Sequence, residues 1–389
     1  MCRFVVNPFC ENPPEFDSSL ASEFGRKDIM SLHRSIPDYA GTPLVELIPL
    51  ADKLGVGRIF VKDESYRFGL KAFKALGASY AIYRYLKEES DKKGEEIPGT
   101  EQFYSSIGWL DKNRYTFCTA TDGNHGRGVA WVARKLNQRA IIYMPSESVK
   151  SRIENIENEG ATVILVNGGY DRAVKKCRKD AIENGWQIIS DTSWAGYEKI
   201  PKWIQAGYIT MFQEISDQLE NHTIDYVIVQ GGVGALLASA VWYFKTNYPV
   251  VKIISVEPVG ADCLLRSAES GAGRPVSISG HASTIMAGLN CGTPSKVAWP
   301  VIQKGVDLFI AISDNYTRDA MREYYLGKPR IISGESGAAG LAAMVAMNMS
   351  ERLRVVRHKL GISEDSSVLL INTEGDTDPV NFARIINEG

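Results

Sequence analysis

Short apolar runs alternate with segments of helical periodicity along most of the chain. Runs rich in β-branched and aromatic residues predict buried strands; they are Gly57–Asp63, Tyr115–Ala120, Arg139–Met144, Thr162–Val166, Trp186–Ser190, Tyr226–Gln230, Val251–Glu257 and Ser367–Asn372. Apolar residues spaced three and four positions apart predict helices over Ala72–Lys87, through Ala130–Leu136, over Ser148–Asn158, Asp171–Asn184 and Lys202–Gln218, from about Ala235, and over Gly337–Met347. This alternation predicts an α/β fold with twisted, mainly parallel sheets flanked by helices on both faces.

The chain has 389 residues, which is enough for two domains. We expect a polar, proline-rich and irregular N-terminal arm over residues 1–40. A large domain is expected from residues 41–80 and 200–389, and a small domain from residues 81–199. Lys92–Gly108 is polar and contains glycine and proline, so we expect a surface loop there.

Charge and cysteine spacing argue against several classes of partner. The 44 basic and 46 acidic residues leave a net charge of -2, which gives no bulk attraction to nucleic acid or to an anionic membrane. No run of about 18 apolar residues and no signal-peptide pattern is found, so a cytoplasmic protein is expected. The six cysteines form no CxxC pair, and no metal site is expected. Cys263 and Cys291 could approach each other or be unrelated thiols.

A glycine-rich turn follows the strand Tyr226–Gln230. Its glycines allow a tight turn, and the start of the next helix offers free N–H groups, a combination that suits a phosphate. The turn has neither the GK[ST] of a P-loop nor a GxGxxG dinucleotide fingerprint, and a turn without ligand is the alternative. Its residues are Gly231, Gly232, Val233, Gly234 and Ala235.

A second polar turn, Thr121–Gly128 (TDGNHGRG), follows the strand Tyr115–Ala120. Asn124 could donate a hydrogen bond to a ligand oxygen, and Asp122 could act as an acid or base. His125 lies in the same turn and is a candidate substrate contact. Aspartate and asparagine also cap helices, but this many functional side chains among glycines favour a ligand site.

Lys71 and Lys74 lie at the start of a predicted helix, in LKAFKALGASY. A lysine can form a covalent bond to a carbonyl cofactor when its pKa is lowered. A lysine on a helix is more often a solvated charge. Lys74 has the more apolar neighbourhood of the two, with Phe73 beside it, but the residues alone do not decide.

Polar residues or a tyrosine follow three further predicted strands. Parallel sheets bind ligands at the carboxyl ends of their strands, so these residues are candidate ligand contacts. Asn372 and Thr373 begin the sequence NTEGDTD after the last predicted strand. Asp191 follows Trp186–Ser190 and could position a substrate ammonium or transfer a proton. Tyr170 follows Thr162–Val166 and could contact substrate. The alternative, which stays equally open, is that Tyr170 only packs against the protein at the start of a helix.

Four of these segments resemble the fold-type II pyridoxal-phosphate (PLP) enzymes, both in sequence and in their order along the chain. They are the segments at Lys74, Thr121–Gly128, Gly231–Ala235 and Asn372–Asp378. This family includes threonine and serine dehydratases and the tryptophan synthase β chain. Ala72–Ala78 (AFKALGA) is similar to the pattern S-F-K-x-R-G-A around the lysine that holds the cofactor, with Ala for Ser and Leu for Arg. The resemblance selects Lys74 over Lys71 and places Phe73 beside the cofactor.

The resemblance assigns three other cofactor contacts. Thr121–His125 is similar to the S-x-G-N-H turn, whose asparagine, here Asn124, binds the phenolic oxygen. Gly231–Ala235 is similar to the phosphate loop. In the family a Ser or Thr after the last strand meets the pyridine nitrogen; spacing to Gly375 puts Asn372 there, and Thr373 is the adjacent hydroxyl, so this pair stays open. A cofactor-binding large domain and a homodimer are also implied.

The more specific resemblance is to the diaminopropionate ammonia-lyases. It is carried by Lys62–Leu70, Thr119–Trp131, Asp191–Tyr197 (DTSWAGY), Ile285–Leu289, Arg330–Gly337 and Asn372–Asp378. It implies a lyase that converts the small amino acid 2,3-diaminopropionate, as D or L isomer, to pyruvate and two ammonia. Ordinary dehydratases have a small residue at the position of Asp122, so Asp122 is predicted to serve the D isomer and Lys74 the L isomer.

Other interpretations stay open at this point. A threonine or D-serine dehydratase of the same fold is one, and Asp122 and DTSWAGY disfavour it. A ligand-binding relative without turnover is another, which the combination of Lys74, Asp122 and Asp191 disfavours. A nucleotide-binding domain that uses Gly231–Gly234 would need an acidic partner for the ribose, which the sequence does not offer in a suitable position.

Overall fold

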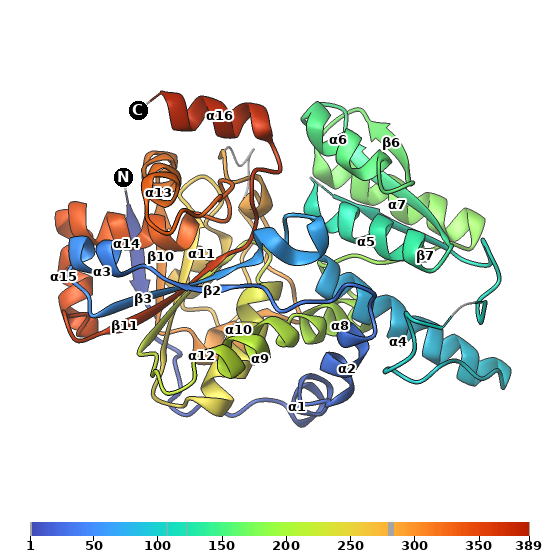
Figure 1. The fold of residues 1–389 in the computed structure, drawn as a ribbon, viewed down its shortest axis with the longest axis horizontal. Helices are drawn as coiled ribbons and strands as arrows, with labels where there is room; N and C mark the ends of the chain where they lie inside the picture. Colours follow the sequence, from blue (N-terminus) through green and yellow to red (C-terminus); the bar gives the residue numbers. More distant parts are fainter. Residues whose placement is uncertain (1, 107, 122, 279–283, 389) are drawn as a thin grey trace. The chain divides into compact units, whose positions relative to one another are not determined.

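The structure is a computed structural model that describes residues 2–106, 108–121, 123–278 and 284–388 (Figure 1). The chain forms two compact units, one of residues 1–21, 41–71 and 211–389 and the other of residues 22–40 and 72–210. The second unit includes residues 22–40 and the whole of α4 (Ala75–Lys93). The domain boundaries expected from the sequence stay a prediction.

The first unit is built on a seven-stranded mixed sheet with the order β1-β10-β9-β8-β11-β3-β2. The inner strands are parallel, and the edge strands β1 and β2 are antiparallel to their neighbours. Every residue of β8, β10 and β11 is buried, as expected for strands covered on both faces. The strands are β1 (Arg3–Val6), β2 (Leu44–Glu46), β3 (Arg58–Asp63), β8 (Tyr226–Gln230), β9 (Lys252–Pro258), β10 (Leu308–Ile312) and β11 (Ser367–Asn372).

Helices cover both faces of this sheet (Figure 1). The apolar helix α14 (Ala339–Met349) packs with α3 (Ile48–Leu54), α13 (Asp314–Leu326) and α15 (Glu351–Leu360) in one hydrophobic cluster with the strands. On the other side, α10 (Ala235–Asn247) contacts β8 and α12 (Trp299–Gly305). The remaining helical segments are η1 (Glu64–Gly69), α9 (Ile209–Gln218), α11 (Cys263–Glu269), η2 (Ala287–Leu289) and α16 (Pro379–Asn387).

The second unit contains a four-stranded sheet of order β6-β5-β4-β7, in which all pairings are parallel. Its strands are β4 (Thr116–Ala120), β5 (Arg139–Pro145), β6 (Thr162–Val166) and β7 (Gln187–Ile188). Its helices are α2 (Asp28–Arg34), α4, α5 (Asn124–Lys135), α6 (Lys150–Glu157), α7 (Tyr170–Asn184) and α8 (Lys199–Gly207). The predicted α/β class with mainly parallel sheets is therefore confirmed. Among the described residues, no helix combines the length and apolarity needed to cross a membrane.

Two local predictions were wrong. The first 40 residues are not irregular, because β1 pairs with the edge strand β10 and α1 (Ser18–Phe24) and α2 are helical. A strand as short as β1 depends on its tertiary partner, which local sequence does not reveal. The helix predicted over Lys202–Gln218 is divided at Tyr208 into α8 and α9. Gly207, the last residue of α8, has room for no side chain, because a Cβ there would lie 2.5 Å from the carbonyl oxygen of Leu76.

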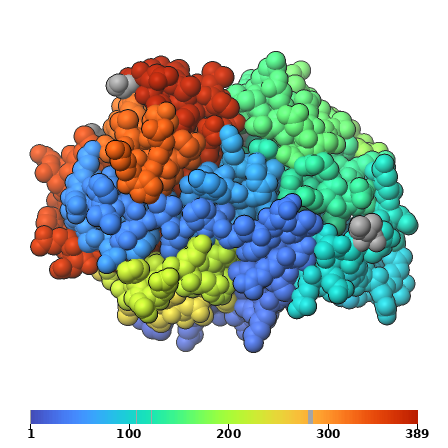
Figure 2. Space-filling model, in the orientation of Figure 1, coloured from blue at the N-terminus to red at the C-terminus, as the bar shows by residue number. Residues whose placement is uncertain are grey.

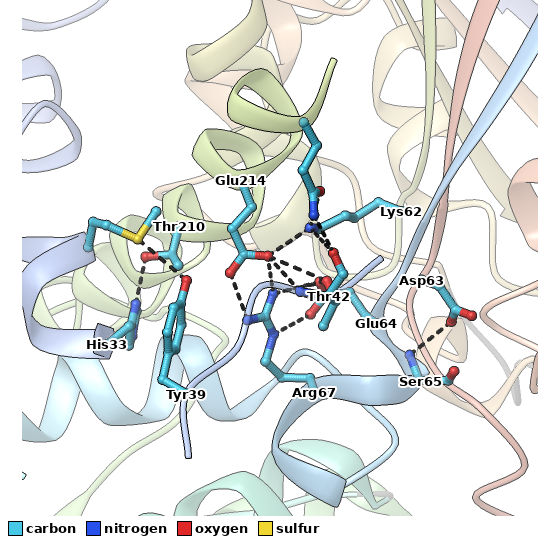
Figure 3. Close-up of polar contacts among 12 residues, drawn as sticks. His33, Tyr39, Thr42, Lys62, Asp63, Glu64, Ser65, Arg67, Thr210 and Glu214 are labelled. Carbon is cyan, nitrogen blue, oxygen red and sulfur yellow. Dashed lines mark hydrogen bonds and ion pairs between the residues drawn. The ribbon is translucent and has the colours of Figure 1, made fainter. Parts of the chain in front are cut away.

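A buried ionic cluster fixes the segment of the first unit that leads from β3 towards Lys71 (Figure 3). The fully buried Arg67 guanidinium donates two hydrogen bonds to Glu64, at 2.9 and 2.8 Å, and two to Glu214, at 2.8 Å each. Lys62 Nζ lies 2.7 Å from Glu214 Oε2, and Thr42 donates to Glu64. Burial would raise the pKa of Glu214, but Arg67 and Lys62 lower it to about 2. These pairs tie β3 and η1 to α9.

Removing Arg67 should therefore strongly destabilise the protein. We expect Arg67→Met to lower the free energy of unfolding by about 3–5 kcal/mol, because two buried carboxylates lose their main partner. Chemical denaturation followed by circular dichroism measures the change. Arg114→Met is the matched control: Arg114 pairs with Glu95 at the surface, and its loss should cost about 0–1 kcal/mol. Equal effects of the two variants would contradict this account.

Candidate active site

Lys74 lies in the second unit, directly before α4, and faces a carboxylate. Its Nζ donates a hydrogen bond of 2.6 Å to Asp191 Oδ2, and the two side chains are 19% and 12% exposed. The ring of Phe73 is 5.4 Å from Nζ. Lys71, in the first unit, is 45% exposed and pairs with Asp376 at 2.7 Å. Of the two candidate lysines, Lys74 is the less exposed and is the one that pairs with the sequence-predicted site residue Asp191.

Asp191 is ionised in this setting. Burial alone would raise its pKa, but the charge of Lys74 and the hydrogen bond from Lys74 hold the pKa well below the usual range. Burial lowers the pKa of His125, so this imidazole is neutral near pH 7 and the charge of Lys74 dominates. His125 Nε2 lies 2.8 Å from the Ile189 carbonyl oxygen and donates to it, while Nδ1 is 3.9 Å from Asp191 Oδ2.

The backbone that carries Asp191 is held by Tyr197. The Tyr197 hydroxyl accepts from the Ser190 N–H at 2.9 Å and donates to the Ile188 carbonyl at 2.9 Å. Its ring stacks on Trp194, with centroids 4.2 Å apart. With the bond from His125 to Ile189, these contacts fix the segment between β7 and Asp191 and so fix the carboxylate opposite Lys74.

Glycines allow the backbones around Lys74 to approach closely. A Cβ on Gly128 of α5 would lie 3.0 Å from the Ala75 nitrogen and 3.2 Å from the Lys74 carbonyl carbon. A Cβ on Gly77 of α4 would lie 2.8 Å from the Ile204 carbonyl oxygen of α8. The start of α4 is thus packed against both neighbouring helices.

The structure places the other predicted residues of the second unit as follows. Asn124 is the first residue of α5, at the carboxyl end of β4. Tyr170 begins α7 and packs against the core of the unit around Cys118 and Tyr143. Asp122 lies outside the described residues, so its role stays a prediction from the sequence.

In the first unit, Gly231–Ala235 form the turn between β8 and α10. Gly232 and Gly234 have φ angles of +61° and +95°, which glycine adopts without strain. A Cβ on Gly231 would lie 2.6 Å from Glu257 Cγ. Among the described residues, no side chain caps α10, whose N-cap residue is Gly234. The first N–H groups of a helix have no intrahelical acceptors, and an uncapped helix start after a glycine turn suits a phosphate.

Comparison with known proteins decides the family. Residues 36–371 match the model described as "Pyridoxal-phosphate dependent enzyme". The chain belongs to this PLP-dependent family. It is 40% identical to the diaminopropionate ammonia-lyase of Escherichia coli (strain K12) over 379 residues, which cover 96% of this chain and 94% of that protein.

Solved structures and a second curated relative agree with this family. A crystal structure of the E. coli diaminopropionate ammonia-lyase in complex with D-serine matches with a TM-score of 0.89 and 38% identity, covering 100% of this chain and 97% of that one. A catabolic L-threonine dehydratase of Staphylococcus aureus (strain USA300) is 27% identical over 363 residues, 93% of this chain and 92% of that protein. The similarity is thus higher to the ammonia-lyase than to this dehydratase.

The residues of the first unit fit PLP at the end of β11. Asn372 is fully buried, and its amide nitrogen donates to Asp63 Oδ1 at 2.7 Å and to the Ile332 carbonyl at 3.1 Å. Among the described residues, Asn372 Oδ1 has no hydrogen-bond partner. Thr373 is 5% exposed. A buried acceptor without a donor costs about 1–3 kcal/mol, and a bound polar group would remove that cost.

Glu257 lies beneath the glycine turn and has no role in the sequence-based predictions. Its carboxylate accepts from the Leu264 N–H at 2.9 Å and the Leu265 N–H at 2.8 Å. Burial raises the pKa of Glu257 to about 8, because these two bonds and the Cys263 thiol compensate only part of the desolvation and Asp262 adds a like charge. Among the described residues, neither Cys263 nor Cys291 forms a disulfide.

This pKa predicts a pH-dependent stability. The folded protein holds the Glu257 proton up to about pH 8 while the unfolded chain releases it near 4.5, so stability falls as pH rises through that window. Between mildly acidic and mildly alkaline pH, we expect the free energy of unfolding of the wild type to fall by about 2–3 kcal/mol relative to that of Glu257→Gln. Each pH unit within the window lowers it by roughly 1.4 kcal/mol. Urea denaturation at fixed PLP concentration measures the difference, and a pH-independent difference would contradict it.

Sequence reasoning missed Tyr208 as well. Tyr208 is fully buried, its ring packs edge-on against Phe73 at 4.8 Å, and the charge of Lys74 acts on its hydroxyl. Nothing in the sequence pattern indicated this position, because it lay inside a predicted continuous helix. Tyr197 could have been found, since it ends the segment DTSWAGY.

Proposed function

We propose that this protein is a PLP-dependent carbon–nitrogen lyase that converts D- and L-2,3-diaminopropionate and water to pyruvate and two ammonia. The main structural support is the part-buried pair of Lys74 and Asp191 at 2.6 Å, in which the candidate cofactor lysine faces an ionised carboxylate. The 40% identity to an enzyme named diaminopropionate ammonia-lyase over nearly the whole chain supports this substrate.

We assign the cofactor contacts as follows. Lys74 holds PLP covalently, with Phe73 packed beside it, and Asn124 donates to the phenolic oxygen. The phosphate binds the turn of Gly231, Gly232, Val233, Gly234 and Ala235. Asn372 or Thr373 meets the pyridine nitrogen. When bound, PLP supplies an electron sink for negative charge at the substrate α-carbon.

The protein side chains then provide binding and proton transfer. Asp191 is ionised and attracts a substrate ammonium group, and His125 and Tyr197 keep this carboxylate in place. The free amine of Lys74 removes the α-proton of the L isomer, and Asp122 removes that of the D isomer. The β-amine leaves as ammonia after it is protonated. Hydrolysis of the released enamine gives pyruvate and the second ammonia. Tyr170 is a further proposed substrate contact.

Neutralising Asp191 should weaken both binding and chemistry. We expect Asp191→Asn to lower kcat/KM by about 10²–10³-fold for both isomers, because a charge-assisted contact to substrate is lost and Lys74 loses its acceptor. Steady-state kinetics with each isomer measure this. Asp180→Asn, in α7, is the control and should leave kcat/KM unchanged. A loss confined to one isomer would assign Asp191 a different role.

The deciding experiment is pyruvate release from D- and L-diaminopropionate, with D-serine, L-serine and L-threonine as comparison substrates. We expect both diaminopropionate isomers to react with higher kcat/KM than the hydroxy amino acids. Faster turnover of threonine or D-serine would make the protein a dehydratase. No turnover of any substrate, with PLP bound, would make it a ligand-binding relative.

We also propose that the enzyme acts in the cytoplasm as a homodimer, as the family resemblance implies. Light scattering of the purified protein after size-exclusion chromatography tests the dimer. A mass near the 42.9 kDa of one chain would contradict it.

A further inference from the structure

The amide of Asn372 has a fixed orientation. Both hydrogens of its nitrogen are used, one by Asp63 Oδ1 at 2.7 Å and one by the Ile332 carbonyl at 3.1 Å. These acceptors lie on different parts of the chain, and a flipped amide would direct its oxygen at both. The sheet register enforces the first contact, because Asn372 of β11 pairs directly with Asp63 of β3.

This orientation leaves the amide oxygen as the free end of the side chain. Asn372 Oδ1 is buried and, within the described part of the chain, has no hydrogen-bond partner. It lies close to the backbone at Gly337, where a Cβ would come within 2.3 Å of it. The end of β11 is adjacent in the sheet to β8, which carries the glycine turn at its own carboxyl end. The unsatisfied atom is therefore an acceptor at the edge where ligands bind to parallel sheets.

An amide oxygen differs from the hydroxyl that the family pattern has at this position. A serine or threonine hydroxyl can donate a hydrogen bond to a neutral pyridine nitrogen, whereas an amide oxygen can only accept one. We propose that Asn372 binds the pyridine nitrogen of PLP in its protonated form and so keeps a positive charge on the ring. This inference rests on the proposed PLP-dependent function and specifies the electronic state of its cofactor.

Asp63 lies on the nitrogen side of the Asn372 amide, opposite the free oxygen, and supports the assignment. It is 2% exposed, it accepts from the Ser65 N–H at 3.1 Å and from Asn372, and no ion pair to it is found among the described residues. Hydrogen bonds in a chain polarise one another, so a carboxylate behind the amide makes Oδ1 a stronger acceptor. Burial raises the pKa of Asp63 above its usual value, and the hydrogen bonds from Ser65 and Asn372 offset only part of the rise. A protonated ring would in turn favour the ionised carboxylate. Asp63 is a positioning residue in this scheme.

The test is nitrogen NMR of the protein reconstituted with PLP labelled with ¹⁵N in the ring. We expect the wild-type ring nitrogen to keep the chemical shift of a protonated pyridine from mildly acidic to mildly alkaline pH. Asn372→Ser should move the chemical shift to that of a neutral pyridine at the alkaline end. Asp63→Asn should lower the pH at which the ring loses its proton. A neutral pyridine in wild type would overturn the proposal. A water molecule would then be the expected donor to Asn372 Oδ1.

Cofactor affinity gives a second readout that does not depend on turnover. An analogue with a CH group in place of the ring nitrogen cannot make the charged hydrogen bond, so wild type should bind it about 10- to 100-fold more weakly than PLP. Asn372→Ser should reduce that ratio. Asn348→Ser is the matched control, because Asn348 donates to the Leu54 carbonyl and its amide oxygen also has no partner among the described residues. Asn348 lies near the C-terminal end of α14, whereas Asn372 Oδ1 lies near Gly337, just before the N-terminal end of that helix. Asn348→Ser should keep the wild-type ratio and the wild-type NMR spectrum.

The same experiments separate this proposal from the proposed function. If no PLP attaches to Lys74, the enzyme assignment fails before the ring nitrogen is observed. If PLP attaches and the lyase reaction proceeds with a neutral ring nitrogen, the function stands and only the role of Asn372 is wrong.

Discussion

Lys74→Ala should abolish turnover of both diaminopropionate isomers and the visible absorbance of the lysine-bound cofactor. We expect kcat to fall by about 10⁴-fold or more, because the variant loses the proposed covalent attachment of the cofactor and the proposed base for the L isomer together. Absorbance spectroscopy of the purified protein and stopped pyruvate assays measure the two effects. The fold should persist, since the residue lies before α4 and not in its core.

Lys71→Ala is the matched control for this experiment. Lys71 is three residues away, has the same charge and loses only a half-exposed pair with Asp376. It should retain the cofactor absorbance and most of the activity. If Lys71→Ala lost the absorbance and Lys74→Ala kept it, the choice between the two lysines would be reversed.

Asp122→Asn should separate the two isomers. With its carboxylate gone, the base for the D isomer is lost, and we expect kcat for D-diaminopropionate to fall by about 10²–10⁴-fold. The L isomer, which depends on Lys74, should change by less than about 10-fold. Kinetics with the pure isomers measure the ratio. Asp111→Asn, at an exposed loop position, is the control and should change neither rate. Equal losses for both isomers would remove Asp122 from its proposed role.

The parallel-sheet core of this fold could be predicted from the sequence because the signal is local. Strands such as Tyr226–Gln230 and Ser367–Asn372 have apolar interiors and are bounded by polar residues, and the structure has them with the same limits. The edge strand Arg3–Val6 could not be predicted, because its pairing with β10 depends on contact across more than 300 residues of chain. The break at Tyr208 also lies beside a tertiary contact, because Gly207 packs closely against α4.

The candidate site divides in a similar way. Lys74, Asn124 and the glycine turn follow from motifs, and Asp191 from its place after a strand. The contacts of Tyr208 and Glu257 could not be predicted from the sequence, since they depend on distances that only the folded chain defines. Asn372 was a candidate from spacing, but the direction of its amide required the register of β11 against β3.

The close packing at Gly77, Gly128 and Gly207 has a consequence for how this enzyme could change in evolution or in the laboratory. Where backbones touch without side chains between them, α4 has little freedom to shift relative to α5 and α8. These helices belong to the second unit, whose residues 72–210 run from light blue through cyan to green in Figure 2 and whose residues 22–40 are darker blue. The backbone at Lys74 therefore has little freedom to move. New substrate preferences should arise at side chains that face the Lys74 amine. A saturation library should accordingly tolerate few replacements at the three glycines, and variants with altered substrate preference should map elsewhere.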